Sequence, residues 1–201
     1  MNHVTTEPGG VRLAAASPRS LWQGPRVRLR AFEAEDWVTY HAWNADDEQA
    51  RNLDQIHVPR SAAAARQWAE REAAREPEGD NVRLVIENER GEVVGDISTH
   101  DCDPRVGTFA YGISITRDQR GQGYAREAIP LLLRYYFAEK RYQKVTVTIF
   151  SYNDASVRLH ERLGFQLEGR IRRAAYTAGA YHDALIYGLT AEEFAERFPA
   201  E

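Results

Sequence analysis

Hydrophobic and polar residues alternate in short segments of this chain, and longer segments with the three-to-four-residue repeat of a helix lie between them. Strict alternation is typical of a half-buried strand. It predicts strands at residues 26–32, 82–86, 93–97, 109–116, 145–149, 167–175 and 181–189. The turn Asn88-Glu89-Arg90-Gly91 joins the second and third strands into a hairpin. The chain is therefore rich in strands that need helices to cover them.

Helical spacing fills the gaps between these strands. Helices are predicted around residues 37–43, at 62–75, for about four turns after residue 123, at 155–163 and at 191–198. Ser61 and Asn153 precede two of them as N-caps, and Gly164 follows one as a stop. Residues 44–60 are polar and predict a loop, or a short helix and a loop. The order predicts a mixed α/β fold with one core: strand, two helices, three strands, helix, strand, helix, two strands.

Length and composition suit one ordinary domain. The 201 residues are 43% hydrophobic, enough for a sizeable core. Residues 1–25 mix Pro, Gly, Ser and Thr, so we expect a flexible leader that docks late through Leu21 and Trp22. We expect the domain itself over residues 26–190 and a helical tail over 191–201.

Charge and cysteine content exclude several classes of protein. The net charge of -4 argues against nucleic-acid binding, which only two small arginine groups (26, 28 and 30; 170, 172 and 173) would favour. The single cysteine, Cys102, excludes an internal disulfide and a cysteine-cluster metal site. No apolar run approaches the ~18 residues of a membrane span, and the N-terminus has no apolar signal core. We expect a cytoplasmic protein with no membrane partner.

The turn before the predicted helix at residue 124 is the strongest chemical signal. Gly121 and Gly123 let the backbone approach a bulky anion, and the N–H groups at the helix start point toward it. Arg117, Arg120 and Arg126 add positive charge nearby. The turn matches neither the P-loop nor the GxGxxG dinucleotide motif. A plain β–α turn, with glycines for geometry alone, remains the alternative.

Arg120-Gly121-Gln122-Gly123-Tyr124-Ala125 resembles the Gln/Arg-x-x-Gly-x-Gly/Ala signature of the GNAT (GCN5-related) N-acetyltransferases. The segment SYNDASVRLHERLGF (151–165) is similar to the Asn-x-x-Ser helix that follows it in that family. The branch it resembles most acetylates ribosomal-protein N-termini and spermidine (RimJ/RimL- and SpeG-like). The resemblance implies a single domain around a twisted, mostly antiparallel sheet of about seven strands. Its fourth and fifth strands would splay apart, and about four helices would flank it.

The resemblance also implies acetyl-CoA as co-substrate, with no metal. The donor's pyrophosphate would bind at Arg120, Gly121, Gln122, Gly123, Tyr124 and Ala125. Its pantetheine arm would pair with backbone at Ile113, Ile115, Thr116 and Arg117. Asn153 would hydrogen-bond the pantetheine or a catalytic water, a role that competes with helix capping, and Ser156 would lie near the thiol.

His160 stands where many relatives carry the tyrosine that protonates the departing thiolate. A neutral imidazole can still donate its N–H, so His160 is the expected acid. The alternative is a packing or solvent-facing histidine. Asn153, Ser156 and His160 are therefore the candidate catalytic residues.

The acceptor site is marked less clearly. Trp37 and Trp43 lie at helical spacing and would wall an acceptor pocket, although such a stripe also suits a core. Candidate bases are Asp96 and Glu33, neither marked by a motif. The acidic run 46–48 would attract a polyamine or a basic peptide, or is a solvated loop. Tyr176 and Tyr181 would line the site or serve a dimer, and the resemblance leaves a homodimer open.

Cys102 stands alone in the sequence and is a poor nucleophile candidate, so we expect an amine to attack the thioester directly. The predicted function is acetyl-CoA-dependent transfer of an acetyl group to a primary amine. That amine would be a protein or peptide N-terminus, or a small amine such as a polyamine or amino acid. The alternatives are a non-catalytic acyl-CoA-binding module and a plain nucleotide-binding α/β protein.

Overall fold

The computed structural model describes residues 20–53 and 56–199. Most of the predicted leader, residues 1–19, lies outside this range. Of its docking residues, Trp22 packs against Tyr135 with ring centroids 4.7 Å apart. The carbonyl of Trp22 accepts a hydrogen bond of 2.8 Å from the Leu29 amide. The segment just before the first strand thus packs on the domain, as predicted for Trp22.

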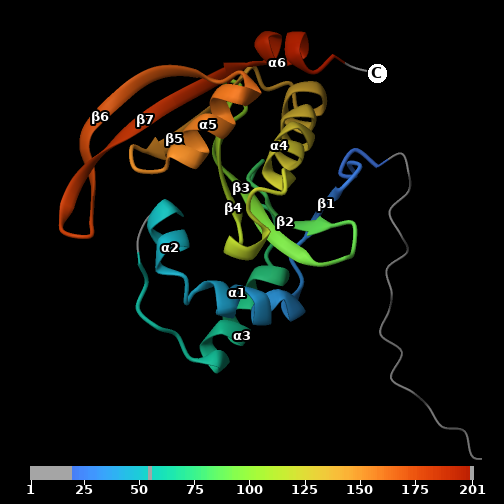
Figure 1. Cartoon of the computed structure of the whole chain (residues 1–201). Helices are drawn as coiled ribbons and strands as arrows, with labels where there is room; N and C mark the ends of the chain where they lie inside the picture. The colour runs from blue at the N-terminus through green and yellow to red at the C-terminus, as the bar shows by residue number, and fades with distance from the viewer. Residues whose placement is uncertain (1–19, 54–55, 200–201) are drawn as a thin grey trace, which may run out of the picture.

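A single seven-stranded sheet forms the centre of the molecule (Figure 1). In spatial order its strands are β1 (Val27–Ala31), β2 (Arg83–Asn88), β3 (Val93–Asp103), β4 (Thr108–Ile115), β5 (Lys144–Phe150), β7 (Ala180–Thr190) and β6 (Gln166–Thr177). Neighbouring strands are antiparallel except for the β4–β5 pair, which is parallel. The mixed α/β class and the strand count are confirmed.

Six α-helices flank the sheet in the described residues, where the hydrophobic pattern predicted five and the resemblance implied about four. They are α1 (Trp37–Trp43), α2 (Asp47–Leu53), α3 (Ala62–Ala73), α4 (Tyr124–Arg134), α5 (Asp154–Leu163) and α6 (Ala191–Arg197). Three helices rather than two separate β1 from β2, because α2 lies within the polar stretch where a loop, or a short helix and a loop, was expected. None of the helices in the described part is long and apolar enough to cross a membrane.

The predicted helix ends are confirmed. The Ser61 hydroxyl accepts from the Ala64 amide at 3.2 Å, and Asn153 caps α5 in the same way. Gly164 ends α5 with a φ of +97°, a conformation that glycine adopts at little cost.

The fourth and fifth strands separate, as predicted. Their pairing runs only from Thr108 opposite Lys144 to Ala110 opposite Thr146. From Tyr111 and Val147 onward the strands diverge, which leaves a gap in the middle of the sheet.

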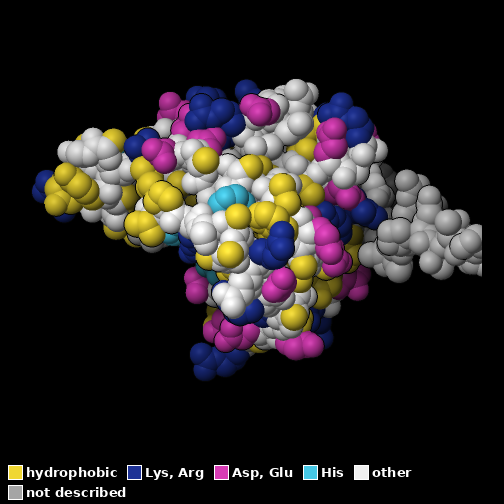
Figure 2. All heavy atoms as spheres, turned by 90° about the horizontal axis from the view of Figure 1, so that it is seen from below, with side chains coloured by type: hydrophobic (Ala, Val, Ile, Leu, Met, Phe, Trp, Pro, Cys, Tyr) yellow, Lys and Arg dark blue, Asp and Glu magenta, His cyan; other side chains and the backbone are white. Residues whose placement is uncertain are grey.

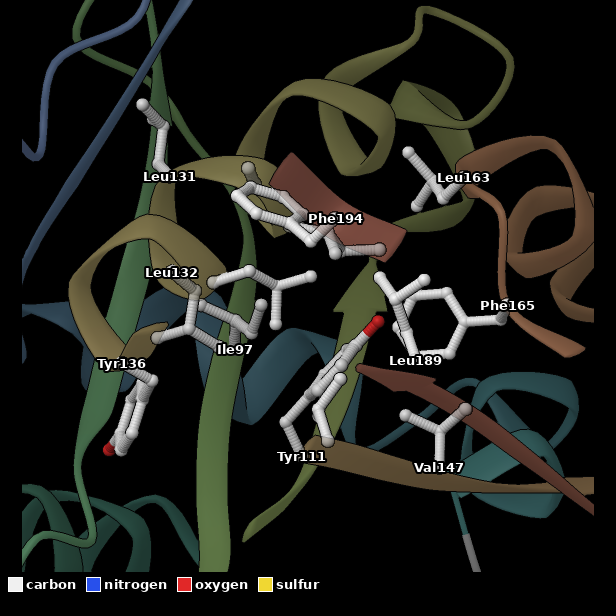
Figure 3. Packing of buried hydrophobic residues seen from close by; sticks show 14 of the residues in the cluster. Ile97, Tyr111, Leu131, Leu132, Tyr136, Val147, Leu163, Phe165, Leu189 and Phe194 are labelled. Carbon is white, nitrogen blue, oxygen red and sulfur yellow. The ribbon is translucent and has the colours of Figure 1, made fainter. Parts of the chain in front are cut away.

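Two clusters of buried side chains hold the layers together. The larger joins one face of the sheet to α4, α5 and α6, and Figure 3 shows part of it, including Ile97, Tyr111, Leu132 and Phe194. The smaller comprises Phe32, Ala69 and Val85, on the opposite face beneath α1 and α3. Residues along β4 therefore alternate between the two faces: Ile113 and Ile115 pack on the larger cluster, and Ser114 points the other way.

The β6–β7 hairpin extends beyond the body of the molecule (Figure 1). Four of its large hydrophobic side chains are exposed: Leu167, Ile171, Tyr176 and Tyr181. Figure 2 shows hydrophobic side chains gathered on this projection. The homodimer that the sequence left open stays a prediction.

Candidate active site

A cleft of about 930 Å³ opens where β4 and β5 separate. Its walls come from the end of β4, the starts of α4 and α5, α2, and the tip of the β6–β7 hairpin. The predicted site residues that line it are Ile113, Ile115, Arg120, Gly121, Gly123, Tyr124, Ala125, Asn153 and Ser156. Segments far apart in the sequence thus meet at one cleft.

The glycine turn forms one end of the cleft. Gly121 and Gly123 have φ angles of +78° and +86°, in the left-handed region. No atom lies within 4 Å of a Cβ placed on Gly121, so the backbone conformation itself requires glycine there. The first helical N–H to find an acceptor is that of Glu127, which donates to the Gly123 carbonyl at 3.3 Å. The N–H groups before it have no partner within α4, which leaves them for an anion.

The start of β1 fixes this turn in place. The Glu127 carboxylate accepts hydrogen bonds from the Arg26 and Val27 amides at 2.7 and 3.1 Å. The Arg26 guanidinium donates to the Gln122 carbonyl at 2.7 Å and lies over the Tyr124 ring. Gln122 therefore belongs to the turn without lining the cleft.

Two of the predicted phosphate-binding arginines are tied to acidic residues beside α2. Arg117 binds Asp46 at 2.8 Å, and Glu48 bridges Arg117 at 3.0 Å and Arg120 at 2.7 Å. Arg117 holds the pKa of Asp46 well below its usual range. Arg120 reaches the cleft, whereas Arg117 and Thr116 do not line it.

Four further arginines line the cleft and make no ion pair with any residue of the described part: Arg51, Arg126, Arg158 and Arg162. Arg126 was predicted from the sequence, and the other three were missed. The turn thus has cationic side chains beside it that no carboxylate neutralises.

The start of α5 forms the opposite wall. The Asn153 side-chain oxygen accepts from the Ser156 amide at 3.1 Å, so its capping role is confirmed. The other end of this carboxamide, the Nδ2 group, remains able to donate to a ligand. Ser156 lines the cleft one helical turn before His160.

His160 lies behind Ser156 and is only 2% exposed. Its Nδ1 is 2.8 Å from the Ser156 carbonyl oxygen, and its Nε2 is 2.9 Å from the Tyr111 hydroxyl. Because a carbonyl only accepts, Nδ1 carries the proton and Nε2 accepts from Tyr111. Burial lowers the pKa of His160, which favours the neutral ring. The imidazole is therefore a neutral group just outside the cleft lining, with the Ser156 hydroxyl 3.3 Å from its Nδ1.

The residues predicted for the acceptor side lie away from the cleft. Trp37 packs on the smaller cluster with Arg66 4.9 Å over its ring, and Trp43 contacts Tyr40 of the same helix with ring centroids 4.7 Å apart. Trp37 therefore serves packing between α1 and α3, the alternative weighed from its spacing, and Trp43 does not line the cleft.

The candidate bases do not line the cleft either. Asp96 pairs with Arg83 at 3.0 Å, and burial raises the pKa of its carboxyl to about 6. Glu33 is exposed and begins the short helical turn before α1.

Burial also raises the pKa of Cys102, which opposes formation of a reactive thiolate.

Several residues that line the cleft carried no recognisable sequence signal. They are Gln49, Asn52 and Leu53 of α2, together with Tyr152 and His182. The Tyr152 hydroxyl donates to the Arg51 carbonyl at 2.5 Å, and its ring lies 4.8 Å from that of His182. Only the position of Tyr152, directly before the capping Asn153, could have singled it out.

Within the described residues, no three His, Cys, Asp or Glu side chains are grouped so that they could hold a metal ion. The chemistry that this cleft offers is anion binding by backbone amides and arginines, beside a narrow polar gap between two strands.

Comparison with known proteins agrees with this geometry. Residues 26–166 match the family model described as the acetyltransferase (GNAT) domain. The chain is 43% identical over 173 residues to an N-acetyltransferase of Bacillus subtilis, YokL, named as SPbeta prophage-derived and uncharacterized; the match covers 86% of this chain and 94% of that protein. The chain belongs to the GNAT family of N-acetyltransferases.

One further relative and one solved structure of the same fold have names that state what they acetylate. An L-methionine sulfoximine/L-methionine sulfone acetyltransferase of Pseudomonas aeruginosa is 32% identical over 109 residues, which cover 53% of this chain and 63% of that protein. The spermidine N-acetyltransferase of Vibrio cholerae, solved in complex with CoA and spermine, has the same fold with a TM-score of 0.74 at 20% identity. That match covers 85% of this chain and 99% of the other.

Proposed function

We propose that this protein is an acetyl-CoA-dependent N-acetyltransferase that transfers an acetyl group to a primary amine by direct attack. The observation that carries the proposal is the glycine turn at Gly121 and Gly123, which opens into the cleft between the separated β4 and β5. A turn of this kind binds a pyrophosphate. The gap between β4 and β5 would give the narrow pantetheine arm of acetyl-CoA access to the edge of β4.

The residues present fit the donor. The amides at the start of α4 would bind the pyrophosphate, and Arg120, Arg126 and Arg158 would supply positive charge. The unpaired edge of β4, from Ile113 to Ile115, would accept the pantetheine arm as an added strand. Asn153, through its Nδ2 group, would donate a hydrogen bond to that arm.

When bound, acetyl-CoA supplies an acetyl group already activated as a thioester. The chain then has to orient the amine and help the thiolate to leave. The CoA thiol resembles a free cysteine with a pKa of ~8.5, so the thiolate is a good leaving group that needs only a modest acid.

We assign that help to Ser156, supported by His160. The Ser156 hydroxyl would hydrogen-bond the sulfur from the wall of the cleft. The His160 Nδ1–H donates to the Ser156 carbonyl at 2.8 Å and lies 3.3 Å from the hydroxyl, so the ring would hold Ser156 in position. Tyr111 orients the ring by its hydrogen bond to Nε2. The histidine would thus act through the serine rather than by contact with the thiol.

The proposal is tested by calorimetric titration of the protein with acetyl-CoA, CoA, ATP and NAD, followed by thiol detection with a panel of amines. We expect acetyl-CoA and CoA to bind in preference to ATP and NAD, and one class of amine to release thiol. Binding of CoA without any thiol release would favour the non-catalytic acyl-CoA-binding module. Failure of both CoA species to bind would overturn the proposal.

A further inference from the structure

Helix α2 closes the gap between β4 and β5 from the face opposite α4 and α5. At its start, Asp46 accepts from the Glu48 and Gln49 amides and binds Arg117 beside the glycine turn. Near its end, the Arg51 carbonyl accepts from Tyr152, directly after β5. The helix is therefore tied to both sides of the cleft, and the side chains that it directs into the cleft are held in place.

Gln49 is the buried residue of α2. It is 6% exposed, and its Nε2 donates to the Ser114 hydroxyl at 2.8 Å. Its other polar atom, Oε1, has no hydrogen-bond partner among the described residues, although Gln49 lines the cleft. Leaving a buried acceptor unpaired costs about 1–3 kcal/mol, so such an atom at a cleft calls for a ligand that donates to it.

The position of Ser114 shows on which face of the sheet Gln49 lies. Ser114 lies on β4 beyond Ala110, the last residue paired with β5, and it points away from the core that Ile113 and Ile115 join. Helix α4, which begins at the glycine turn, packs on the face of the sheet that Ile113 and Ile115 join, opposite to Ser114. Gln49 therefore stands on the side from which a second substrate meets the acetyl end of the donor.

The charged side chains near α2 indicate the charge of the amine that this part of the cleft binds. Two carboxylates line the cleft in the described residues, Glu48 and Asp154. Glu48 is already held by Arg117 and Arg120, and Asp154 is an exposed residue at the start of α5. A neutral carboxamide accepts an N–H without favouring the ammonium form over the free amine, whereas a carboxylate favours the ammonium.

We propose that Gln49 is the acceptor-binding residue of this enzyme, its Oε1 receiving an N–H of the attacking amine, and that the acceptor is an α-amine of an amino acid or peptide rather than a polyamine. This inference rests on the function proposed above. It adds the class of acceptor and the residue that selects it.

The pKa of an α-amine agrees with the neutral carboxamide of Gln49 as its binding partner. An α-amine with a pKa of ~7.7–8.0 is about one-third unprotonated at pH 7.5, whereas an alkylamine with a pKa of ~10.4 is unprotonated in about one molecule in a thousand. The nitrogen lone pair attacks the thioester carbon, an N–C bond forms and the C–S bond breaks. One proton leaves the nitrogen for solvent and one is taken up by the sulfur, which gives an amide and free CoA.

The test compares wild type with Gln49→Leu and Gln49→Glu, and uses Gln67→Leu as the matched control on an exposed position of α3. Thiol release is measured with amino acids, short peptides and spermidine, and acetyl-CoA affinity is measured by calorimetry. We expect wild type to prefer α-amines. Gln49→Leu should lower kcat/KM for them about tenfold or more while acetyl-CoA affinity stays within twofold. Gln49→Glu should shift the preference toward spermidine by about tenfold, and Gln67→Leu should change nothing.

A wild-type preference for spermidine, or an unchanged kcat/KM in Gln49→Leu, would overturn the inference while leaving acetyl transfer intact. Absence of acetyl-CoA binding and of thiol release in wild type would overturn the proposed function and this inference with it. Gln49→Glu, which keeps the shape of the side chain, gives an independent answer if Gln49→Leu loses its fold.

Discussion

Tyr111 of β4 donates a hydrogen bond of 2.9 Å to the Nε2 atom of His160 on α5, across the line where β4 and β5 begin to separate. Both side chains are buried, and Figure 3 shows Tyr111 directed toward the region of Phe165 and Leu163 at the end of α5. The bond leaves the imidazole neutral, with its remaining proton on the Nδ1 atom beside Ser156. The Tyr111–His160 pair therefore fixes α5 against β4 and also sets the orientation of the ring beside Ser156.

Tyr111→Phe should lower both stability and turnover. It leaves the buried Nε2 lone pair without a donor, at a cost of about 1–3 kcal/mol, or several degrees in melting temperature for a domain of this size. The loosened ring should reduce kcat more than acetyl-CoA affinity. Thermal melting and steady-state kinetics check this, with Tyr176→Phe as control because its side chain is exposed. A variant as stable and active as wild type would show that the pair is dispensable.

The Asp96 carboxyl should make the free energy of unfolding fall as the pH rises from about 4 to about 6. Its folded-state pKa of about 6 lies above the ~3.9 of an unfolded chain. The folded protein therefore binds a proton that the unfolded chain lacks, and the stability from this proton is present below pH ~4 and lost as the pH rises through about 6.

Asp96→Asn cannot titrate and should escape this loss. Its unfolding free energy relative to wild type should rise between pH 4 and 7, by at most about 3 kcal/mol from a shift of some two pKa units. Denaturant unfolding at several pH values measures the difference. The exposed Asp101→Asn is the control on the same strand. A difference that is flat with pH would show that burial does not raise the pKa of Asp96.

Glu48→Gln should tighten acetyl-CoA binding. In the structure the Glu48 carboxylate occupies Arg117 and Arg120, so an incoming pyrophosphate must compete with it. An exposed ion pair is worth about 0.2–1 kcal/mol, which corresponds to at most about a fivefold gain in affinity. Calorimetry at low and high salt measures it, with the exposed Glu70→Gln as control. Weaker binding would mean that Glu48 positions Arg120 rather than competing for it.

Gly123→Ala should weaken donor binding beyond its effect on stability. The residue has a φ of +86°, so an added Cβ costs about 1–2 kcal/mol in strain and stands where the backbone must approach the anion. Gly91→Ala is a matched control, since Gly91 has a φ of +77° in the β2–β3 turn and does not line the cleft.

Both glycine variants should melt at lower temperature than wild type, and only Gly123→Ala should lose about tenfold or more in acetyl-CoA affinity. Equal affinities in the two variants would mean that the turn is a structural feature alone.

Elements with a clear hydrophobic period could be predicted from the sequence. All seven strands, the capped helices α3 and α5, and the glycine turn before α4 lie where alternation, caps and glycines place them. Helix α2 could not be predicted firmly, because DEQARNL has no apolar stripe and its one buried side chain is a glutamine. Its position depends on ion pairs to residues about seventy positions away.

The candidate site divides along the same line. The glycine turn follows from a local motif, and five residues of that motif line the cleft: Arg120, Gly121, Gly123, Tyr124 and Ala125. The facing part of the cleft is assembled from α2, Tyr152 and the β6–β7 hairpin, which only the tertiary fold brings together. Trp37 and Trp43 have the spacing of a pocket wall, yet Trp37 packs on the smaller cluster with Arg66 of α3 over its ring, and Trp43 contacts Tyr40 of its own helix. Local spacing shows which face of a helix is buried, not what covers it.

The most direct test of the account is a crystal structure of the protein grown with acetyl-CoA. We predict that the pyrophosphate oxygens accept hydrogen bonds from the backbone amides of residues 121–125, and that the acetyl end lies between β4 and β5 near Ser156. A donor bound at another surface, or a turn that makes no contact with the pyrophosphate, would contradict the account.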